Sequence, residues 1–257
     1  MKVITIGNEK GGVGKTTTAT TIAAGLAHKG HRVLMIDADA QGHATRALGL
    51  NKQPALYNWL VRSANYQEVL QAVPAERYAA LDGATNFYLV ASNVETRNIA
   101  NSISDAYAVA DVLTPLESLF DYVVIDTSPT PSLLHGAIYL ATDYMIYPTL
   151  CEYWSFDGLA ESLSRRQQVQ HMHKVVTAGI IPYRVRLQTL EHSENLARLR
   201  DQFKELVWEP IPESIVWAEA TAYHVPVFVY APDHAAVDSV WSMVARVEAL
   251  PEVARES

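Results

Sequence analysis

The chain has 257 residues and a formal net charge of −8, and 49% of its residues are hydrophobic. These proportions are ordinary for a globular protein and exclude a disordered or fibrous chain, and the acidic balance does not favour general attraction to nucleic acid or to anionic lipid. A chain of this length can bury one sizeable core, so we expect a single domain over residues 1–257.

The first predicted element is a strand at residues 3–6, which begins almost at the first residue. No charged and then apolar leader precedes it, and no later stretch approaches the roughly 20 apolar residues that span a bilayer. The sequence therefore predicts a protein that is neither exported nor inserted in a membrane.

A glycine-rich turn at residues 10–17, KGGVGKTT, follows this strand and opens a helical pattern. Glycine permits positive φ and close approach of the backbone, and a helix N-terminus presents free N–H groups to an anion. The turn predicts a phosphate cradle in which Lys15 reaches the terminal phosphates and Thr16 binds Mg²⁺. The standard P-loop has glycine six positions before the lysine, where Glu9 stands here, and Lys10 is an additional lysine. The predicted nucleotide-binding residues are Lys10, Gly11, Gly12, Val13, Gly14, Lys15, Thr16 and Thr17.

Two carboxylates are expected beside this cradle. Apolar residues at helical spacing continue to Ala27, and the apolar run at 32–36 is typical of a buried parallel strand. A right-handed crossover brings the end of that strand to the edge of the sheet that holds the cradle. The strand ends in Asp37 and Asp39, which fit the handling of a cation or of a water. For Asp37 alone, capping of the next turn is the alternative.

The middle of the chain continues the α/β alternation. Residues 43–86 predict short helices and turns, residues 87–92 predict a strand, and residues 99–119 are expected to contain a helix. An apolar strand from residue 121 then ends in Asp126, the form of a Walker B strand whose carboxylate holds magnesium. Such a strand is common by chance, and its pairing with the cradle gives the prediction its weight.

A further strand is expected at residues 144–148, followed by the aromatic stretch 151–159. The single cysteine, Cys151, excludes a disulfide within the chain, and we expect it to be a small core residue in a reducing, cytoplasmic compartment. The neighbouring Glu152 and the aromatic residues predict a ligand edge or a subunit interface, with core and turn packing as the alternative.

These motifs resemble the deviant Walker A motif, the A-prime motif and the partition-branch segment of the ParA/MinD family of ATPases, with Ala40 in place of the usual A-prime proline. The resemblance is closest to the ParA (Soj-like) DNA-partition branch without an N-terminal helix-turn-helix domain. It implies a doubly wound α/β fold with a predominantly parallel sheet and helices on both faces.

The resemblance also implies roles for individual residues, with ATP and Mg²⁺ as cofactors. Lys10, Lys15 and Asp39 would be catalytic: Lys10 reaches the partner's nucleotide in an ATP-dependent homodimer, and Asp39 positions the attacking water. Thr16, Asp37 and Asp126 would form the metal site. A centromere-binding, ParB-like adaptor is the implied partner, and the implied location is cytoplasmic, in association with the nucleoid.

The positive charges of the C-terminal half give a candidate DNA surface. The proposed contacts are Arg165, Arg166, Lys174, Arg184 and Arg186, with a solvated helix face as the alternative. Partition ATPases that bind nonspecific DNA commonly carry arginine where Glu213 and Val216 stand here. Two further helices are expected at 193–207 and 237–247 and a strand start at 226–227, and the last helix has no lysine-rich face of the membrane-seeking kind.

Three functions remain open at this point. The first is a DNA-segregation ATPase, in which ATP hydrolysis to ADP and phosphate controls the binding of DNA and adaptor. The second is a positioning or regulatory ATPase that uses the same switch on a protein cargo, which the missing arginines favour. The third, a small-molecule synthetase of the same fold, would need a substrate pocket that the sequence does not identify, and Lys10 argues against it.

Overall fold

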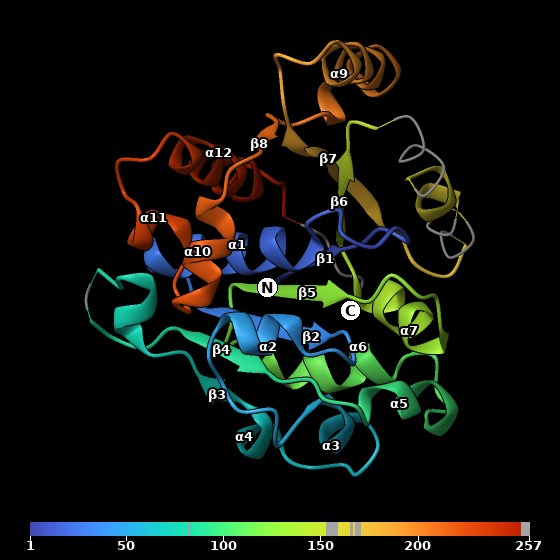
Figure 1. Cartoon of the computed structure of the whole chain (residues 1–257). Helices are drawn as coiled ribbons and strands as arrows, with labels where there is room; N and C mark the ends of the chain where they lie inside the picture. Colours follow the sequence, from blue (N-terminus) through green and yellow to red (C-terminus); the bar gives the residue numbers. More distant parts are fainter. Residues whose placement is uncertain (82, 153–158, 165–166, 168–170, 253–257) are drawn as a thin grey trace.

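The computed structural model describes residues 1–252 except 82, 153–158, 165–166 and 168–170. One eight-stranded sheet runs through it in the order β3-β4-β2-β5-β1-β6-β7-β8 (Figure 1). All neighbouring strands pair in parallel apart from β3 with β4. The strands are β1 (Lys2–Ile6), β2 (Val33–Ala38), β3 (Gln71–Ala72), β4 (Phe87–Val90), β5 (Tyr122–Thr127), β6 (Tyr144–Leu150), β7 (Val176–Val185) and β8 (Ile211–Pro212).

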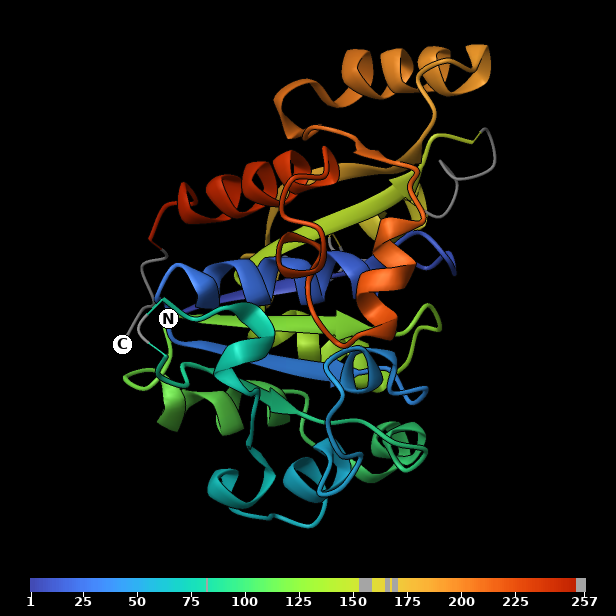
Figure 2. The same cartoon turned by 60° about the vertical axis from the view of Figure 1, so that its left-hand side comes forward.

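Helices cover both faces of the sheet, as Figure 2 shows from the side. Alternate residues of a strand face opposite sides, so β5 sends Val124 into the core beneath α1 and α12 and Val123 into the core beneath α6 and α7. The predicted doubly wound α/β fold is therefore confirmed. The longer α-helices are α1 (Lys15–His28), α5 (Thr96–Ser102), α6 (Ala108–Leu113), α7 (Leu133–Ala141), α9 (Leu190–Phe203), α10 (Val216–Ala222) and α12 (Ala236–Glu248), and the short ones are α2 (His43–Ala47), α3 (Leu56–Leu60), α4 (Tyr66–Val69) and α11 (Val227–Tyr230).

The strand expected to start at residues 226–227 is wrong. Val227–Tyr230 forms α11, and the carbonyl of Pro226 accepts from the N–H groups of Val229 and Tyr230. Proline has no N–H to lose before the first helical turn, so it suits this position. The buried ring of Phe228 packs 4.9 Å from that of Trp241 on α12, so tertiary packing outweighs the strand preference of the valines.

Other boundaries also differ from the expected ones. The range 99–119 holds the expected helix as α6, and the end of a second helix, α5, which begins at Thr96, also lies in it. The helix expected at 193–207 begins at Leu190 and ends at Phe203. Lys204, with φ of 47° and ψ of −121°, ends the α-helix, and a short 3-10 turn (Lys204–Leu206) follows. The two-residue strand β3 lies in the segment for which only short helices and turns are expected.

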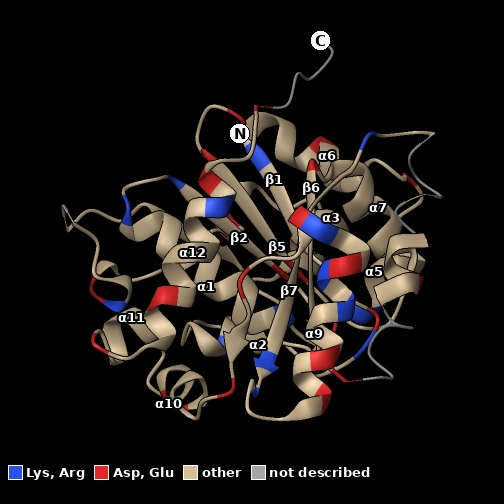
Figure 3. Cartoon of the chain, turned by 90° about the horizontal axis from the view of Figure 1, so that it is seen from above, with Lys and Arg blue, Asp and Glu red and all other residues tan. Residues whose placement is uncertain are grey.

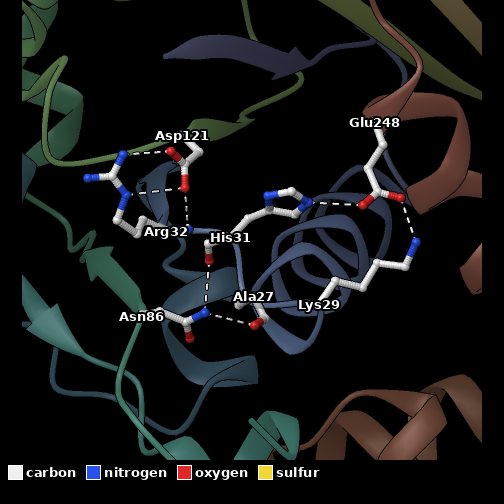
Figure 4. Close-up of polar contacts among 7 residues, drawn as sticks. All are labelled: Ala27, Lys29, His31, Arg32, Asn86, Asp121 and Glu248. Atoms are coloured by element: carbon white, nitrogen blue, oxygen red, sulfur yellow. Dashed lines mark hydrogen bonds and ion pairs between the residues drawn. The ribbon is translucent and has the colours of Figure 1, made fainter. Parts of the chain in front are cut away.

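The edge of the sheet opposite the glycine loop is tied by a polar network (Figure 4). His31 Nε2 lies 2.9 Å from Glu248 Oε1, which links the end of α1 to α12. Arg32 Nη2 lies 2.6 Å from Asp121 Oδ1, and the Asn86 amide donates to the carbonyls of Ala27 and His31. These contacts hold α1 against the sheet and so set where the loop before α1 lies. Among the described residues, no helix is both long and apolar enough to cross a membrane.

Candidate functional site

The glycine loop joins β1 to α1 in the conformation that a phosphate cradle requires. Gly12 and Gly14 have φ of +75° and +92°, a region that favours glycine. A Cβ on Gly14 would lie 2.7 Å from the ring of Tyr183, which comes from β7. The hydroxyl of Tyr183 donates to Thr17 Oγ1 at 3.4 Å, so β7 closes one side of the loop. Val13, within the loop, is fully buried.

A cavity of about 1350 Å³ opens over this loop. It lies beyond the carboxyl ends of the parallel strands, where doubly wound folds bind their ligands. Its volume exceeds that of a typical small-molecule pocket, so it has room for a nucleoside triphosphate. Its lining includes Gly12, Lys15, Thr16, Asp39, Tyr183 and Glu213.

Lys15 lies in the floor of the cavity with its ammonium folded back on the loop. Its Nζ donates to the carbonyl of Lys10 at 2.9 Å. Burial lowers the pKa of Lys15, and the charges of Asp126 and Asp39 oppose that shift. An anion placed in the loop gives this buried ammonium a partner, which is the arrangement expected of a phosphate-binding lysine.

Thr16 and Asp126 form a pair of oxygen ligands next to Lys15. The hydroxyl of Thr16 donates to Asp126 Oδ2 at 2.7 Å. Asp126 is fully buried, and its Oδ1 has no hydrogen-bond partner in the described part of the chain. A buried carboxylate oxygen left in this state is costly, and hydroxyl and carboxylate oxygens are the ligands that Mg²⁺ takes. The residues therefore fit a magnesium ion. Burial, with the charge of Asp37, raises the pKa of Asp126.

Asp37 lies beside Asp126, because the two residues are register partners on β2 and β5. Its Oδ2 accepts from the N–H and the hydroxyl of Thr45 at 2.8 and 2.7 Å, and its Oδ1 accepts from the N–H of Asp39 at 3.2 Å. Burial raises the pKa of Asp37 to about 6. These bonds anchor α2, which is the kind of structural role that the capping alternative describes. A place for Asp37 in the magnesium shell stays a prediction.

Asp39 and Lys10 flank the loop. Asp39 lines the cavity, and its Oδ1 accepts from the N–H of Gln41 at 2.9 Å. Lys10 Nζ lies 3.4 Å from Glu152 Oε2 of the same chain, with 31% of the lysine side chain exposed. The N–H of Lys10 donates to Asn8, whose amide in turn donates to the carbonyl of Pro148 on β6. Asn8, which the sequence analysis missed, therefore ties the loop to the sheet.

A second missed residue is His135, on α7. Its Nε2 lies 3.0 Å from the carbonyl of Ser128 and its Nδ1 lies 3.0 Å from the hydroxyl of Ser132. A carbonyl only accepts, so Nε2 carries a proton. These bonds pin the loop that follows Asp126, and all three residues line the cavity. The sequence signal for them is their position just after the carboxyl end of a strand.

The candidate DNA contacts do not form one cluster. Lys174 precedes β7 and Arg184 lies near its other end, about 30 Å away at the rise of an extended strand. Arg165 and Arg166 lie outside the described residues. Figure 3 shows basic and acidic residues interspersed over the molecule, including along α9.

Arg184 and Arg186 lie together and share a carboxylate. Arg184 Nη2 is 2.8 Å from Glu213 Oε1, and Arg186 Nε binds the other oxygen of Glu213. Their hydrogen bonds lower the pKa of Glu213 to about 2. Val216, the second residue at a usual arginine position, is the first residue of α10 and is buried, so a charge there would be costly.

Comparisons with known proteins found relatives that match most of the chain. A family model described as an AAA domain, AAA_31, matches residues 1–177, a range that holds the glycine loop, Asp39 and Asp126. The chain is 30% identical over 237 residues to the sporulation initiation inhibitor protein Soj of Bacillus subtilis (strain 168), with 90% of this chain and 92% of Soj covered. It is 32% identical over 243 residues to the chromosome partitioning protein ParA of Myxococcus xanthus (strain DK1622), with 89% of this chain and 81% of that protein covered.

A solved structure extends the similarity to a nucleotide complex. Cobyrinic acid a,c-diamide synthase of Mycobacterium smegmatis, with a bound ATP analog and magnesium, is 26% identical with a TM-score of 0.74, and the match covers 90% of this chain and 94% of that one. That structure holds an ATP analog and magnesium together on a similar fold.

Proposed function

This chain belongs to the ParA-type family of partition ATPases, and from that premise we propose that it uses ATP hydrolysis to control the assembly and release of a DNA-partition complex. The observation that carries the proposal is the hydrogen bond between the Thr16 hydroxyl and the buried carboxylate of Asp126, beside Lys15 at the mouth of the glycine loop. The partner would be a centromere-binding, ParB-like adaptor, and the location would be the cytoplasm.

In the proposed reaction, a water attacks the γ-phosphate of ATP and leaves ADP and phosphate. Lys15 exchanges the carbonyl of Lys10 for phosphate oxygens, and the loop N–H groups share the charge that develops there. Asp39 orients the water. Thr16 and Asp126 would hold Mg²⁺, which when bound supplies positive charge to the phosphate oxygens.

The proposed switch is a dimer that forms with ATP. Lys10 would leave Glu152 of its own chain and reach the nucleotide of a second copy, so that each site is complete only in the dimer. The pair is half exposed and therefore weak enough to be exchanged.

The test compares Lys10→Ala with Lys29→Ala. Lys29 is a matched control because it also pairs with a glutamate, Glu248, but at the opposite edge of the sheet. We expect wild type and Lys29→Ala to dimerise with ATP in light scattering after gel filtration, and Lys10→Ala to remain monomeric with hydrolysis lowered about 100-fold. Normal dimerisation and turnover of Lys10→Ala would contradict the proposed role of Lys10.

A second candidate is a positioning or regulatory ATPase that moves a protein cargo without the usual nonspecific DNA surface. Two observations favour this candidate. Arg184 and Arg186 are already bound to Glu213, and Val216, at a usual arginine position, is buried. ATP-dependent dimerisation without DNA retention at any salt concentration is the result that would select this candidate.

A further inference from the structure

Arg184, Arg186 and Glu213 form a charge cluster at the lip of the nucleotide cavity, which Arg184 and Glu213 both line. Two guanidinium groups share one carboxylate, each through a different oxygen. The three side chains together keep a net positive charge. An anion from outside therefore finds attraction at this point even though the whole chain is acidic.

A bulge near the end of β7 redirects Arg184 toward Glu213, and Arg186 follows just beyond the strand. The register of β7 with β8 shifts between Tyr183 and Val185, and Arg184 between them has φ of 55°. A bulge leaves one residue out of the ladder and redirects its side chain. Val185 is buried, and its carbonyl accepts from the N–H of Glu213 at 3.2 Å. The backbone hydrogen bond to Val185 and the two side-chain contacts therefore together hold the Glu213 carboxylate against both arginines.

The chemistry of the cluster is that of a phosphate site filled by a carboxylate. The guanidinium fork matches carboxylate and phosphate oxygens alike. The side chains of Arg184 and Arg186 are 54% and 52% exposed, whereas that of Glu213 is 27% exposed. The cations therefore face solvent and the acid lies deeper, so an external anion reaches the arginines before it meets Glu213.

We propose that Glu213 is an internal competitor for DNA phosphate. Arg184 and Arg186 bind the backbone of duplex DNA when the carboxylate is displaced, and Glu213 keeps that binding weak otherwise. The inference rests on the proposed partition function and adds the residue that sets its DNA affinity. A polyanion is favoured over an acidic protein because an external carboxylate has no advantage over one held in place, whereas DNA gains from counterion release.

The segment that carries Glu213 gives the competitor a connection to the nucleotide. It continues into Trp217 and Thr221, which line the same cavity as the glycine loop. A nucleotide that contacts this segment acts on the element that holds the carboxylate. Affinity for DNA is therefore to be measured both with ATP and without nucleotide.

The experiment compares Glu213→Gln with wild type and with Glu209→Gln by fluorescence anisotropy of a labelled duplex, from about 50 to 200 mM salt. Glu209 is a matched control because it pairs with Arg200 at 3.5 Å and its replacement changes the net charge equally. A triple variant adds Arg184→Ala and Arg186→Ala to Glu213→Gln. ATP-dependent dimerisation of every sample is measured in parallel.

We expect Glu213→Gln to bind the duplex about tenfold more tightly at the lowest salt, with a salt slope steeper by roughly 1.8, the value for two phosphate contacts. Glu209→Gln should match wild type, and the triple variant should lose the gain. Equal binding by Glu213→Gln and Glu209→Gln, or a gain that persists in the triple variant, overturns the inference. Equal binding with normal dimerisation would point to a protein partner for this face. Failure of the wild-type protein to dimerise with ATP would instead contradict the proposed function.

Discussion

At the scale of single residues, the hydroxyl of Thr16 and the carboxylate of Asp126 decide what the cavity binds. Asp126 Oδ1 has no hydrogen-bond partner among the described atoms, because the hydroxyl of Thr16 donates to Oδ2 and not to Oδ1. The pair is preorganised for a cation, because the ion gains ligands that the fold has already positioned and desolvated.

Replacement of Thr16 by alanine should remove the magnesium dependence of nucleotide binding. We expect Thr16→Ala to lower ATP hydrolysis at least about 100-fold and to bind ATP equally well with and without Mg²⁺. Thr20→Ala is the control, since the Thr20 hydroxyl bonds only to backbone carbonyls of its own helix among the described contacts. Calorimetric titration with and without Mg²⁺ measures the effect, and retained magnesium dependence in Thr16→Ala would refute it.

Asp37 should make the stability of the nucleotide-free protein depend on pH. Its folded pKa of about 6 lies above the ordinary 3.8, so the folded state binds more protons between these values. The free energy of unfolding therefore falls as pH rises through this window, by about 3 kcal/mol for this group.

The variant Asp37→Asn isolates this contribution, because the amide oxygen still accepts from Thr45. We expect the difference in unfolding free energy, wild type minus Asp37→Asn, to decrease between about pH 4 and pH 6 in urea titrations without nucleotide. A difference that stays constant across that range would show that Asp37 is charged in the folded state throughout.

At the scale of elements, the glycine loop and β7 act as one unit, since the ring of Tyr183 occupies the space next to Gly14. Alanine at position 14 would be strained by the positive φ, and its Cβ would also clash with this ring. Alanine at Gly30, with φ of +93° and no atom near its Cβ, meets only the backbone strain.

We expect Gly14→Ala and Gly30→Ala each to lose about 1 kcal/mol of stability from the left-handed backbone. Only Gly14→Ala should also lose ATP binding, because the loop must move away from Tyr183. Thermal unfolding and nucleotide titration of the two variants check this. Equal ATP binding by both would mean that the contact with β7 does not shape the cradle.

The sequence was sufficient for the elements whose signal is local. The central strands are continuous apolar runs, and α1 and α12 have clear helical periodicity, so both kinds were predicted. The helix α11 was missed because two of its four residues are valine, and only its packing against Trp241 makes it helical. The partners of His135 and Asn8 were missed because they depend on where loops meet, which no local pattern encodes.

At the scale of the whole molecule, the sheet order decides which predicted residues meet. Placement of β2 and β1 on either side of β5 brings Asp37, Asp126 and the glycine loop to one edge. The crossover rule predicted that convergence. The same sheet separates Lys174 from Arg184, because β7 runs between them. Sequence alone placed both in one candidate surface, since charge carries no information about which end of a strand a residue occupies.

The shared carboxylate at Glu213 also has an evolutionary consequence. Codons for glutamate and lysine differ by one base, so a single mutation reverses the sign of the charge at this residue and releases two neighbouring arginines at once. A lineage with this arrangement lies one substitution from a different electrostatic character on the lip of its nucleotide cavity, while its glycine loop and sheet stay as they are.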